Sequence, residues 1–309
     1  MLGLLDRWIT RDRVAVYAVM LLTAEMIAAG LWAASLNHDL DPTGTPVGGD
    51  FLIFYAASAL VLKGKAVLAY AAAPFLAAQH AVVPASRALL LYAYPPVWQL
   101  MAAPLALLPF LWAYAGFELT TFLALLAVLR SLTRARLMWL ATLAFPAVFL
   151  NALQGQNGFL TAALIGFGLA KLDRRPWLAG VALGLACYKP HLGVLLPVLL
   201  AGSGRWRPFV AATATVGALV TTSLVVFGVE DWRAFLTALP EASAHLDSGA
   251  LPWAKMPSLY VAMRSLGASA ATAAAVQALG AVAVAGVTLY SWRAGGPGRP
   301  RRRWPVSPS

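Results

Sequence analysis

The sequence predicts an all-α, polytopic integral membrane protein with about eight spanning helices and interfacial helices in the first outer loop. Of its 309 residues, 61% are hydrophobic and 11% are charged, which is less than half of the roughly 25% charged residues of a soluble domain. The mean hydropathy is +0.73, and several apolar runs reach the roughly 20 residues that a helix needs to cross a bilayer. A soluble protein of this size cannot bury that much apolar surface in one core.

The same composition excludes other classes of protein. This apolar fraction is incompatible with disorder, and a lone cysteine, Cys187, excludes a disulfide scaffold. The net charge is +11, from 23 basic and 12 acidic residues. Because the basic residues stand between apolar runs and not on one face, we attribute them to the positive-inside rule and expect no nucleic-acid partner.

The first spanning helix is predicted at Val14–Leu36, after a basic start that we place in the cytoplasm. The run is too long for a secretory signal peptide, and no small-residue cleavage site follows it. The next stretch, Asn37–Pro95, carries no excess of basic residues, so we place it outside. Within it, Phe51–Leu62 is predicted to form a helix that is too short to span and lies at the interface.

The later crossings follow from four basic clusters, which we place in the cytoplasm with an even number of crossings between neighbours. The clusters are Arg130/Arg134/Arg136, Lys171/Arg174/Arg175, Arg205/Arg207 and Arg299/Arg301/Arg302/Arg303. The predicted crossings are Phe110–Leu129, a hairpin of Leu137–Leu150 with Gly158–Ala170, a hairpin within Pro176–Ala201, Phe209–Phe227 and Ala270–Trp292. Residues 1–292 then form one transmembrane domain, and 293–309 form a basic Pro/Gly/Arg-rich tail that we expect to be disordered and cytoplasmic.

Three stretches do not fit simple crossings. Pro95–Pro109 holds four prolines and is interpreted as a broken interfacial or re-entrant piece; two spans hinged at Pro109 are the alternative, which would place the Arg130 cluster outside. Pro176–Ala201 is too short for two full spans at about 1.5 Å per residue. Its tip, Tyr188 to His191, is therefore expected below the outer surface, beside a cavity. Gly228–Ser258 is predicted to be a second outer loop.

Most of the unusual polar residues fall in the outer loops and hairpin tips. They are Asp50, Gln156, Asn157, Lys189, His191, His245 and Lys255. Ionisable groups at membrane depth are costly and are functional hypotheses by default. Asp50 opens the predicted short helix, either as its N-cap or as a catalytic acid. The two roles are compatible, because capping hydrogen bonds keep a carboxylate ionised.

The other polar residues also allow two interpretations. Lys189 either snorkels to the interface or binds an anion such as a ligand phosphate, since it is recessed and no acid lies nearby in the sequence. A structural hydrogen bond is as good an account of His191. The amides of Gln156 and Asn157 either close the hairpin turn between two glycines or bind sugar hydroxyls.

Several well-known catalytic signatures are missing from the sequence. It contains no GxxxxGK[ST] phosphate loop, no GxGxxG after a strand, no HExxH and no Gly-x-Ser-x-Gly. Four scattered histidines and one cysteine give no metal-ligand spacing. The sequence therefore offers no apparatus for ATP hydrolysis, nicotinamide chemistry, zinc hydrolysis or serine hydrolysis.

Five short motifs occur in the same order as in a known membrane family. They are Gly48-Gly49-Asp50-Phe51 with Phe54-Tyr55, Tyr94-Pro95-Pro96, Pro104 to Pro109, Gly155-Gln156-Asn157-Gly158, and Gly180 to Gly184 leading into Tyr188-Lys189-Pro190-His191. With these motifs the chain resembles the family 87 glycosyltransferases, multi-pass enzymes of the GT-C superfamily that include polyprenyl-phosphate-mannose-dependent α-mannosyltransferases. The resemblance runs from about the first helix to Ser258–Tyr260.

The resemblance implies a GT-C-type helix bundle in the plasma membrane, with its active site on the outer face. It implies a polyprenyl-phosphate sugar donor, mannose by default with arabinose or another sugar as alternatives, and a lipid or glycan acceptor, with a protein acceptor as a further possibility. It also implies an inverting transfer from a β-linked donor to an α-linked product. Neither a cofactor nor a metal is expected on this pattern.

The resemblance further implies roles for single residues. Asp50 matches the family's catalytic acid and would act as general base on the acceptor hydroxyl. Lys189 matches the basic residue that neutralises the donor phosphate, and His191 is expected beside it. The expected substrate-binding residues are Tyr55, Tyr94, Gln156, Asn157, His245 and Lys255.

The C-terminus departs from the family pattern, in which further membrane helices usually follow. After Trp292 the sequence continues directly into the basic tail, which suggests a truncated form, and we expect such a form to be less active than longer relatives or inactive. A membrane transporter or flippase and a scaffold without catalysis are the alternative functions. The sequence shows no internal repeat of the kind that a transporter favours.

Overall fold

The computed structural model describes residues 10–294, apart from 39, 89, 250–252, 254–255 and 257. Over these residues the chain is helical and contains no named strand; two isolated β-bridges link Asn37 to Leu40 and Leu40 to Pro46. The all-α prediction is confirmed. Of the predicted tail at 293–309, only the first two residues fall within the description, as the end of the last helix.

The helices follow one another with short connections. In chain order they are α2 (Arg11–Ser35), α3 (Gly49–Leu62), η1 (Ala66–Tyr70), α4 (Ala72–His80), α5 (Pro96–Ala102), η2 (Ala103–Leu107), α6 (Phe110–Leu132), α7 (Leu137–Leu143), α8 (Pro146–Gln154), α9 (Gly158–Lys171), α10 (Pro176–Leu185), η3 (Ala186–Tyr188), α11 (Pro190–Gly193), α12 (Leu196–Gly202), α13 (Trp206–Phe227), α14 (Val229–Asp247), α15 (Leu259–Ser265) and α16 (Ala270–Ala294). Proline stands at the first or second position of several of them, where its missing N–H removes no helical hydrogen bond.

Four helices of the described chain, α2, α6, α13 and α16, are long and apolar enough to cross a membrane. The bent pair α7–α8 makes a fifth candidate if it is one span; its 51° bend lies at Ala144 and Phe145, directly before Pro146, and proline is a common cause of such breaks. The prediction of a polytopic membrane protein is confirmed. The count of about eight stays a prediction, because α9, α10 and α12 are shorter than the roughly 20 residues of a full crossing.

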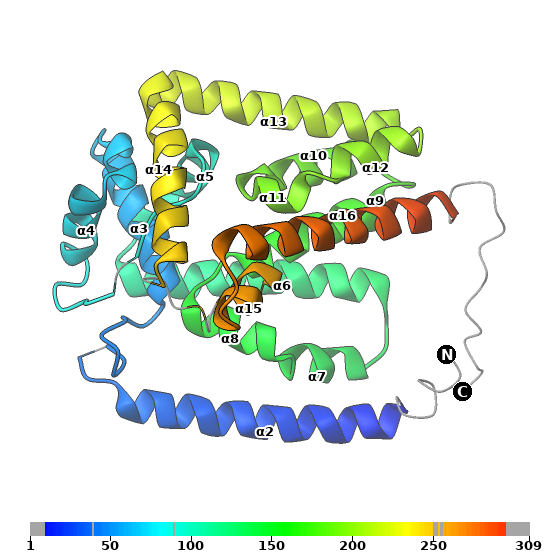
Figure 1. The fold of residues 1–309 in the computed structure, drawn as a ribbon. Helices are drawn as coiled ribbons and strands as arrows, with labels where there is room; N and C mark the ends of the chain where they lie inside the picture. The colour runs from blue at the N-terminus through cyan, green and yellow to red at the C-terminus, as the bar shows by residue number, and fades with distance from the viewer. Residues whose placement is uncertain are drawn as a thin grey trace.

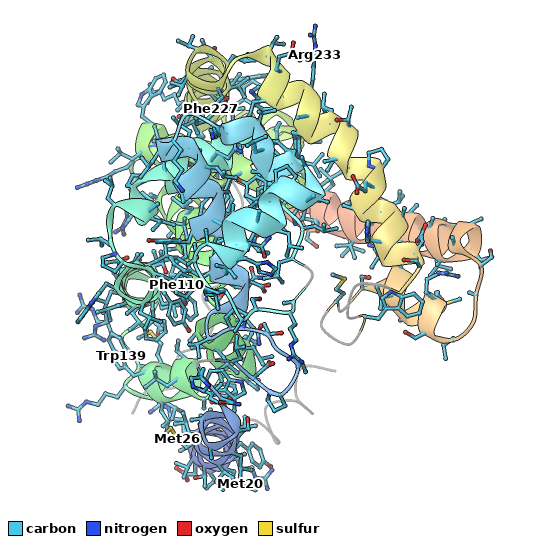
Figure 2. All side chains as sticks on the ribbon, turned by 90° about the vertical axis from the view of Figure 1, so that its left-hand side faces the viewer. Met20, Met26, Phe110, Trp139, Phe227 and Arg233 are labelled. Atoms are coloured by element: carbon cyan, nitrogen blue, oxygen red, sulfur yellow. The ribbon has the colours of Figure 1, made fainter. Side chains whose placement is uncertain are left out.

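The long helices run roughly parallel to one another, with α2 and α13 at opposite edges, as Figure 1 shows, and α14 runs across them at one end. Figure 2 views that end, with Arg233 of α14 at the upper edge and α2, which carries the exposed Met20 and Met26, at the lower edge. The sequence predicted only an outer loop at Gly228–Ser258. The structure instead forms a helix of 19 residues there, which begins with two acids in its first turn, Glu230 and Asp231, where acidic side chains favour a helix.

At the opposite end of the bundle, a basic side chain links α13 to the α9–α10 connection and to α16. Arg205, just before α13, forms a 2.6 Å ion pair with Asp173 of the α9–α10 connection. Its guanidinium also lies 6.0 Å from the ring centre of Trp292 in α16. The basic clusters around Lys171 and Arg205 therefore lie at the same end of the bundle, together with the end of α16. This agrees with their assignment to one side of the membrane.

Helix α3 is central to the fold. Eight of its 14 residues are buried, and it contacts η1, α4, α5, η2 and α6. The sequence placed this helix at the membrane interface; in the structure it is a core helix, and a helix that is apolar on all sides is expected to be buried. Ser58 ties it to α5, since its hydroxyl donates to the Ala102 carbonyl at 2.8 Å. The stretch Pro95–Pro109 is broken as predicted, into α5 and η2.

Candidate functional site

Asp50 lies in the first turn of α3, half-buried. The N-cap of this helix is Gly48, in the left-handed conformation with φ 66°, so the interpretation of Asp50 as the N-cap is wrong by two positions. A Cβ on Gly48 would lie 3.1 Å from the Tyr114 ring, which leaves little room for another residue. The free N–H groups and the dipole of the helix still favour a negative charge at Asp50.

The turn between α8 and α9 contacts Asp50. Gln156 donates a hydrogen bond from Nε2 to Asp50 Oδ2. Gly155 takes the left-handed conformation with φ 69° and packs on Phe51, where an added Cβ would come within 2.5 Å of the Phe51 Cβ. Asn157 is fully buried, and its side chain lies against the Tyr94 hydroxyl, which in turn lies close enough to Asp50 to feel its charge.

Lys189 stands at the break between η3 and α11, outside the candidate spans. Burial lowers the pKa of Lys189, while the negative charge of Asp50 opposes that shift. The two charged side chains that the sequence singled out are therefore close enough for their charges to interact. Partial desolvation and the neighbouring Lys189 charge lower the pKa of His191, so this imidazole is neutral at pH 7.

The break that carries Lys189 is held by its neighbour Tyr188. This ring is buried and lies 4.6 Å from the Trp98 ring, centre to centre. Its hydroxyl shares a 2.7 Å hydrogen bond with Thr161 Oγ1 in α9 and donates to the Asn157 carbonyl at 3.4 Å. Tyr188 thereby links the Lys189 break to the turn that meets Asp50. Neither Trp98 nor Thr161 was predicted to have a role at the site. Nothing in the sequence near them indicates that each contacts Tyr188.

An apolar cavity of about 720 Å³ adjoins the residues described above, which we call the polar cluster. Its members are Asp50, Tyr94, Gln156, Asn157, Lys189 and His191. The cavity lies among α10, α11, α12, α13 and the first turns of α14. Pro95, Cys187 and Pro190 line it, and these are chain neighbours of Tyr94, Tyr188 and Lys189. The volume falls within the roughly 300–1,000 Å³ of small-molecule sites. A cavity beside the tip, as expected from the short hairpin, is present in the structure, whereas the depth of the tip below the outer surface stays a prediction.

Two predicted substrate-binding residues, Tyr55 and His245, are not part of this cluster. The Tyr55 hydroxyl donates to the Leu108 carbonyl at 2.9 Å, and its ring packs on Phe110 at 5.3 Å. His245, in the last turn of α14, is half-buried, and its Nδ1 lies 2.8 Å from the Glu241 carbonyl oxygen. Lys255 lies outside the described residues. Six predicted residues do converge: Asp50, Tyr94, Gln156, Asn157, Lys189 and His191.

The cluster joins one carboxylate, one ammonium group, two amides, a phenol and an imidazole, and chain neighbours of three residues in this region line the apolar cavity. Such a set can accept a proton, neutralise an anion and orient hydroxyl groups. In the described part of the chain, no three His, Cys, Asp or Glu side chains gather closely enough to hold a metal ion.

Comparison with known proteins gives one match. The model of the family described as glycosyltransferase family 87 matches residues 92–305, most of the chain. The matched region includes the α8–α9 turn and the Lys189 break, whereas Asp50 precedes it. Comparisons with curated proteins and with solved structures gave no match.

Proposed function

Because the chain belongs to glycosyltransferase family 87, we propose that it moves a hexose, by default mannose, from a polyprenyl-phosphate donor to a lipid or glycan acceptor. The reaction is placed at the outer face of the plasma membrane, opposite the end that gathers the basic residues. The observation that carries the proposal is the convergence of Asp50 and Lys189 beside an apolar cavity.

Each part of the site has a role in this reaction. Asp50 takes the proton of the acceptor hydroxyl while that oxygen attacks the anomeric carbon of the sugar. The bond from this carbon to the phosphate oxygen breaks, and polyprenyl phosphate leaves with the electron pair. Lys189, with His191 beside it, neutralises the phosphate charge that develops. Attack from the face opposite the leaving group inverts the anomeric centre and converts a β-linked donor into an α-linked product.

The remaining residues position the substrates. Gln156 donates to one oxygen of Asp50 and so fixes the orientation of the carboxylate toward the acceptor. Tyr94 is close enough to this carboxylate to be affected by its charge, and Tyr94 and Asn157 supply groups for sugar hydroxyls. The apolar cavity accommodates the part of the prenyl chain next to the phosphate, because only a lipid-like group fits a lining of this kind. Holding donor and acceptor in one orientation accounts for much of the rate gain that such an enzyme needs.

Transfer is tested with membranes that carry the chain, radiolabelled polyprenyl-phosphate-mannose and total cell lipids. We expect label in a new species, together with release of polyprenyl phosphate, in the wild-type sample. Asp50→Asn should abolish the transfer. Asp41→Asn is the matched control, because it removes the same charge from the connection before α3, where Asp41 accepts hydrogen bonds from the backbone of Thr43 and Thr45. Equal transfer by both variants would contradict the role of Asp50.

A transporter or flippase of a lipid-linked substrate is the second candidate. The bent pair α7–α8 and the break between α10 and α11 favour it, because broken helices line the substrate sites of many transporters. The same assay separates the two functions, since a transporter moves the lipid across the bilayer and releases no polyprenyl phosphate.

A further inference from the structure

A second acid lies inside the bundle, where the proposed reaction does not use it. Glu118 is in the middle of α6, one of the candidate spans, and its side chain is 8% exposed. Ionisable groups in spans are rare and are usually kept for a function. Figure 1 shows α8 beside this helix, and it is the C-terminal half of α8 that Glu118 contacts.

The contact runs through one side-chain amide. Asn151 of α8 donates from Nδ2 to Glu118 Oε2 at 3.1 Å and to the Gln156 carbonyl at 2.8 Å. Its Oδ1 accepts the N–H of Gly158 at 2.9 Å. Both N–H bonds and the oxygen of this amide are therefore in use. The orientation of Asn151 fixes the two ends of the α8–α9 turn, and Glu118 fixes Asn151.

A second bond from α6 supports the same place. Tyr114 lies one helical turn before Glu118, and its hydroxyl donates to the Ala152 carbonyl, next to Asn151. Helix α6 thus holds the end of α8 at two successive points on one face. The turn that follows carries Gln156, whose Nε2 reaches Asp50. A continuous set of hydrogen bonds therefore joins Glu118 to the proposed general base.

We propose that Glu118 is a positioning residue: through Asn151 it holds the α8–α9 turn where Gln156 meets the Asp50 carboxylate. The consequence for catalysis rests on the proposed function, whereas the coupling of Glu118 to the turn does not. Two amides separate the acids, and neutral amides do not pass protons on, so the role is orientation and not proton transfer. Glu118 Oε1 has no hydrogen-bond partner among the described residues, so one acceptor oxygen is enough for the role.

The coupling is read by hydrogen exchange of the purified full chain. In Glu118→Leu we expect the amides of Gln156 and Gly158 to exchange about tenfold faster or more, because the Asn151 donor loses its acceptor, while α16 exchanges as before. Glu118→Gln keeps an acceptor oxygen and should restore slow exchange. Thr121→Val is the matched control: it changes a buried side chain of α6 that bonds only backbone carbonyls of its own helix.

The same variants are compared in sugar transfer. Glu118→Leu should lower kcat about tenfold to a hundredfold, the range for a misplaced catalytic group, with little change in KM for the donor. Glu118→Gln should recover most of that loss, and Thr121→Val should not lower kcat.

Three results would overturn the inference. Exchange at Gln156 and Gly158 that is no faster in Glu118→Leu than in Thr121→Val would remove the coupling. Faster exchange throughout the chain, α16 included, would reduce Glu118 to a folding role. Faster exchange at the turn with an unchanged kcat would remove the link to catalysis. If the wild-type chain transfers no sugar, the proposed function fails, and the exchange comparison still decides the coupling.

Discussion

Gly155 offers a test of the turn geometry that needs no substrate. Its φ of 69° lies in the left-handed region, and an added Cβ would come within 2.5 Å of the Phe51 Cβ and 3.0 Å of Tyr114. Gly204, after α12, has the same φ of 69°, and nothing lies within 4 Å of its added Cβ. Alanine at Gly155 therefore meets both backbone strain and crowding, whereas alanine at Gly204 meets the strain alone.

The expected cost follows from these two differences. A left-handed alanine costs about 1–2 kcal/mol at either position. Forcing a methyl group into packed surroundings adds about 1–3 kcal/mol at Gly155 only. Both substitutions reduce the freedom of the unfolded chain in the same way, so this term cancels in the comparison. Gly155→Ala should therefore lower the free energy of unfolding by about 1–3 kcal/mol more than Gly204→Ala.

The assay is denaturant unfolding of the two purified variants in the same detergent micelles. A reduced sugar-transfer rate should accompany the loss at Gly155, because the methyl group presses on Phe51, the residue after Asp50. Equal losses of stability in the two variants would refute the close packing of the turn on α3, and with it the geometry that brings Gln156 to Asp50.

Further predictions concern the charged groups and the cavity. Lys189→Met should weaken binding of polyprenyl phosphate about tenfold to a hundredfold, since a charge-assisted hydrogen bond contributes about 1.5–3 kcal/mol; an equal affinity in a vesicle-binding assay would contradict the phosphate role. Burial lowers the pKa of Lys189, and the Asp50 charge opposes that shift. Asp50→Asn should therefore lower the pKa of Lys189 further. As the pH rises, this variant should lose phosphate binding at a lower pH than the wild type does. Burial raises the pKa of Asp231 from 3.8 to about 6, so the folded state binds its proton more tightly than the unfolded state does, and stability falls as pH rises through this window. Asp231→Asn should flatten that fall, by up to about 3 kcal/mol in unfolding measurements, and an unchanged pH dependence would contradict it. Saturating polyprenyl phosphate should slow maleimide labelling of Cys187, the sole cysteine, which lines the cavity; unchanged labelling would place the prenyl chain elsewhere.

The long spans could be predicted because their length and hydropathy are properties of a continuous stretch. The prediction at Phe110–Leu129 matches α6 (Phe110–Leu132), and that at Phe209–Phe227 matches α13 (Trp206–Phe227). The short helix α3 was predicted at the right place, but its burial was not. In a membrane protein an apolar side chain suits both lipid and core, so composition does not show which of the two a helix faces.

The site was predicted in part for a similar reason. Asp50, Gln156 and Lys189 stand out as polar residues in apolar surroundings, and the order of the motifs links them. Glu118 carries the same signal, an acid inside an apolar run, but it lies within a predicted span and not in an outer loop or hairpin tip, where the polar candidates were expected. The contact of Asn151 with Glu118 has no sequence signature, because it depends on which faces of α6 and α8 meet.

For the amphipathic helix α14, by contrast, the sequence did contain a signal that was not used. Its 19 residues combine charged and apolar side chains and include Pro240, and the charged residues led to the interpretation of the stretch as an outer loop. Its apolar side packs on the core around Tyr70, where Phe235 lies 5.9 Å from that ring, centre to centre. Helical periodicity was the available signal.

The role of Asp50 is the central claim, and single-turnover transfer by the purified chain tests it most directly. Wild-type and Asp50→Asn proteins are each saturated with radiolabelled polyprenyl-phosphate-mannose, and binding of polyprenyl phosphate is measured beside the rate. The account predicts a rate reduced about 10²–10⁴-fold, as for loss of a general base, with binding within a few-fold of wild type. Transfer by Asp50→Asn at the wild-type rate would contradict it.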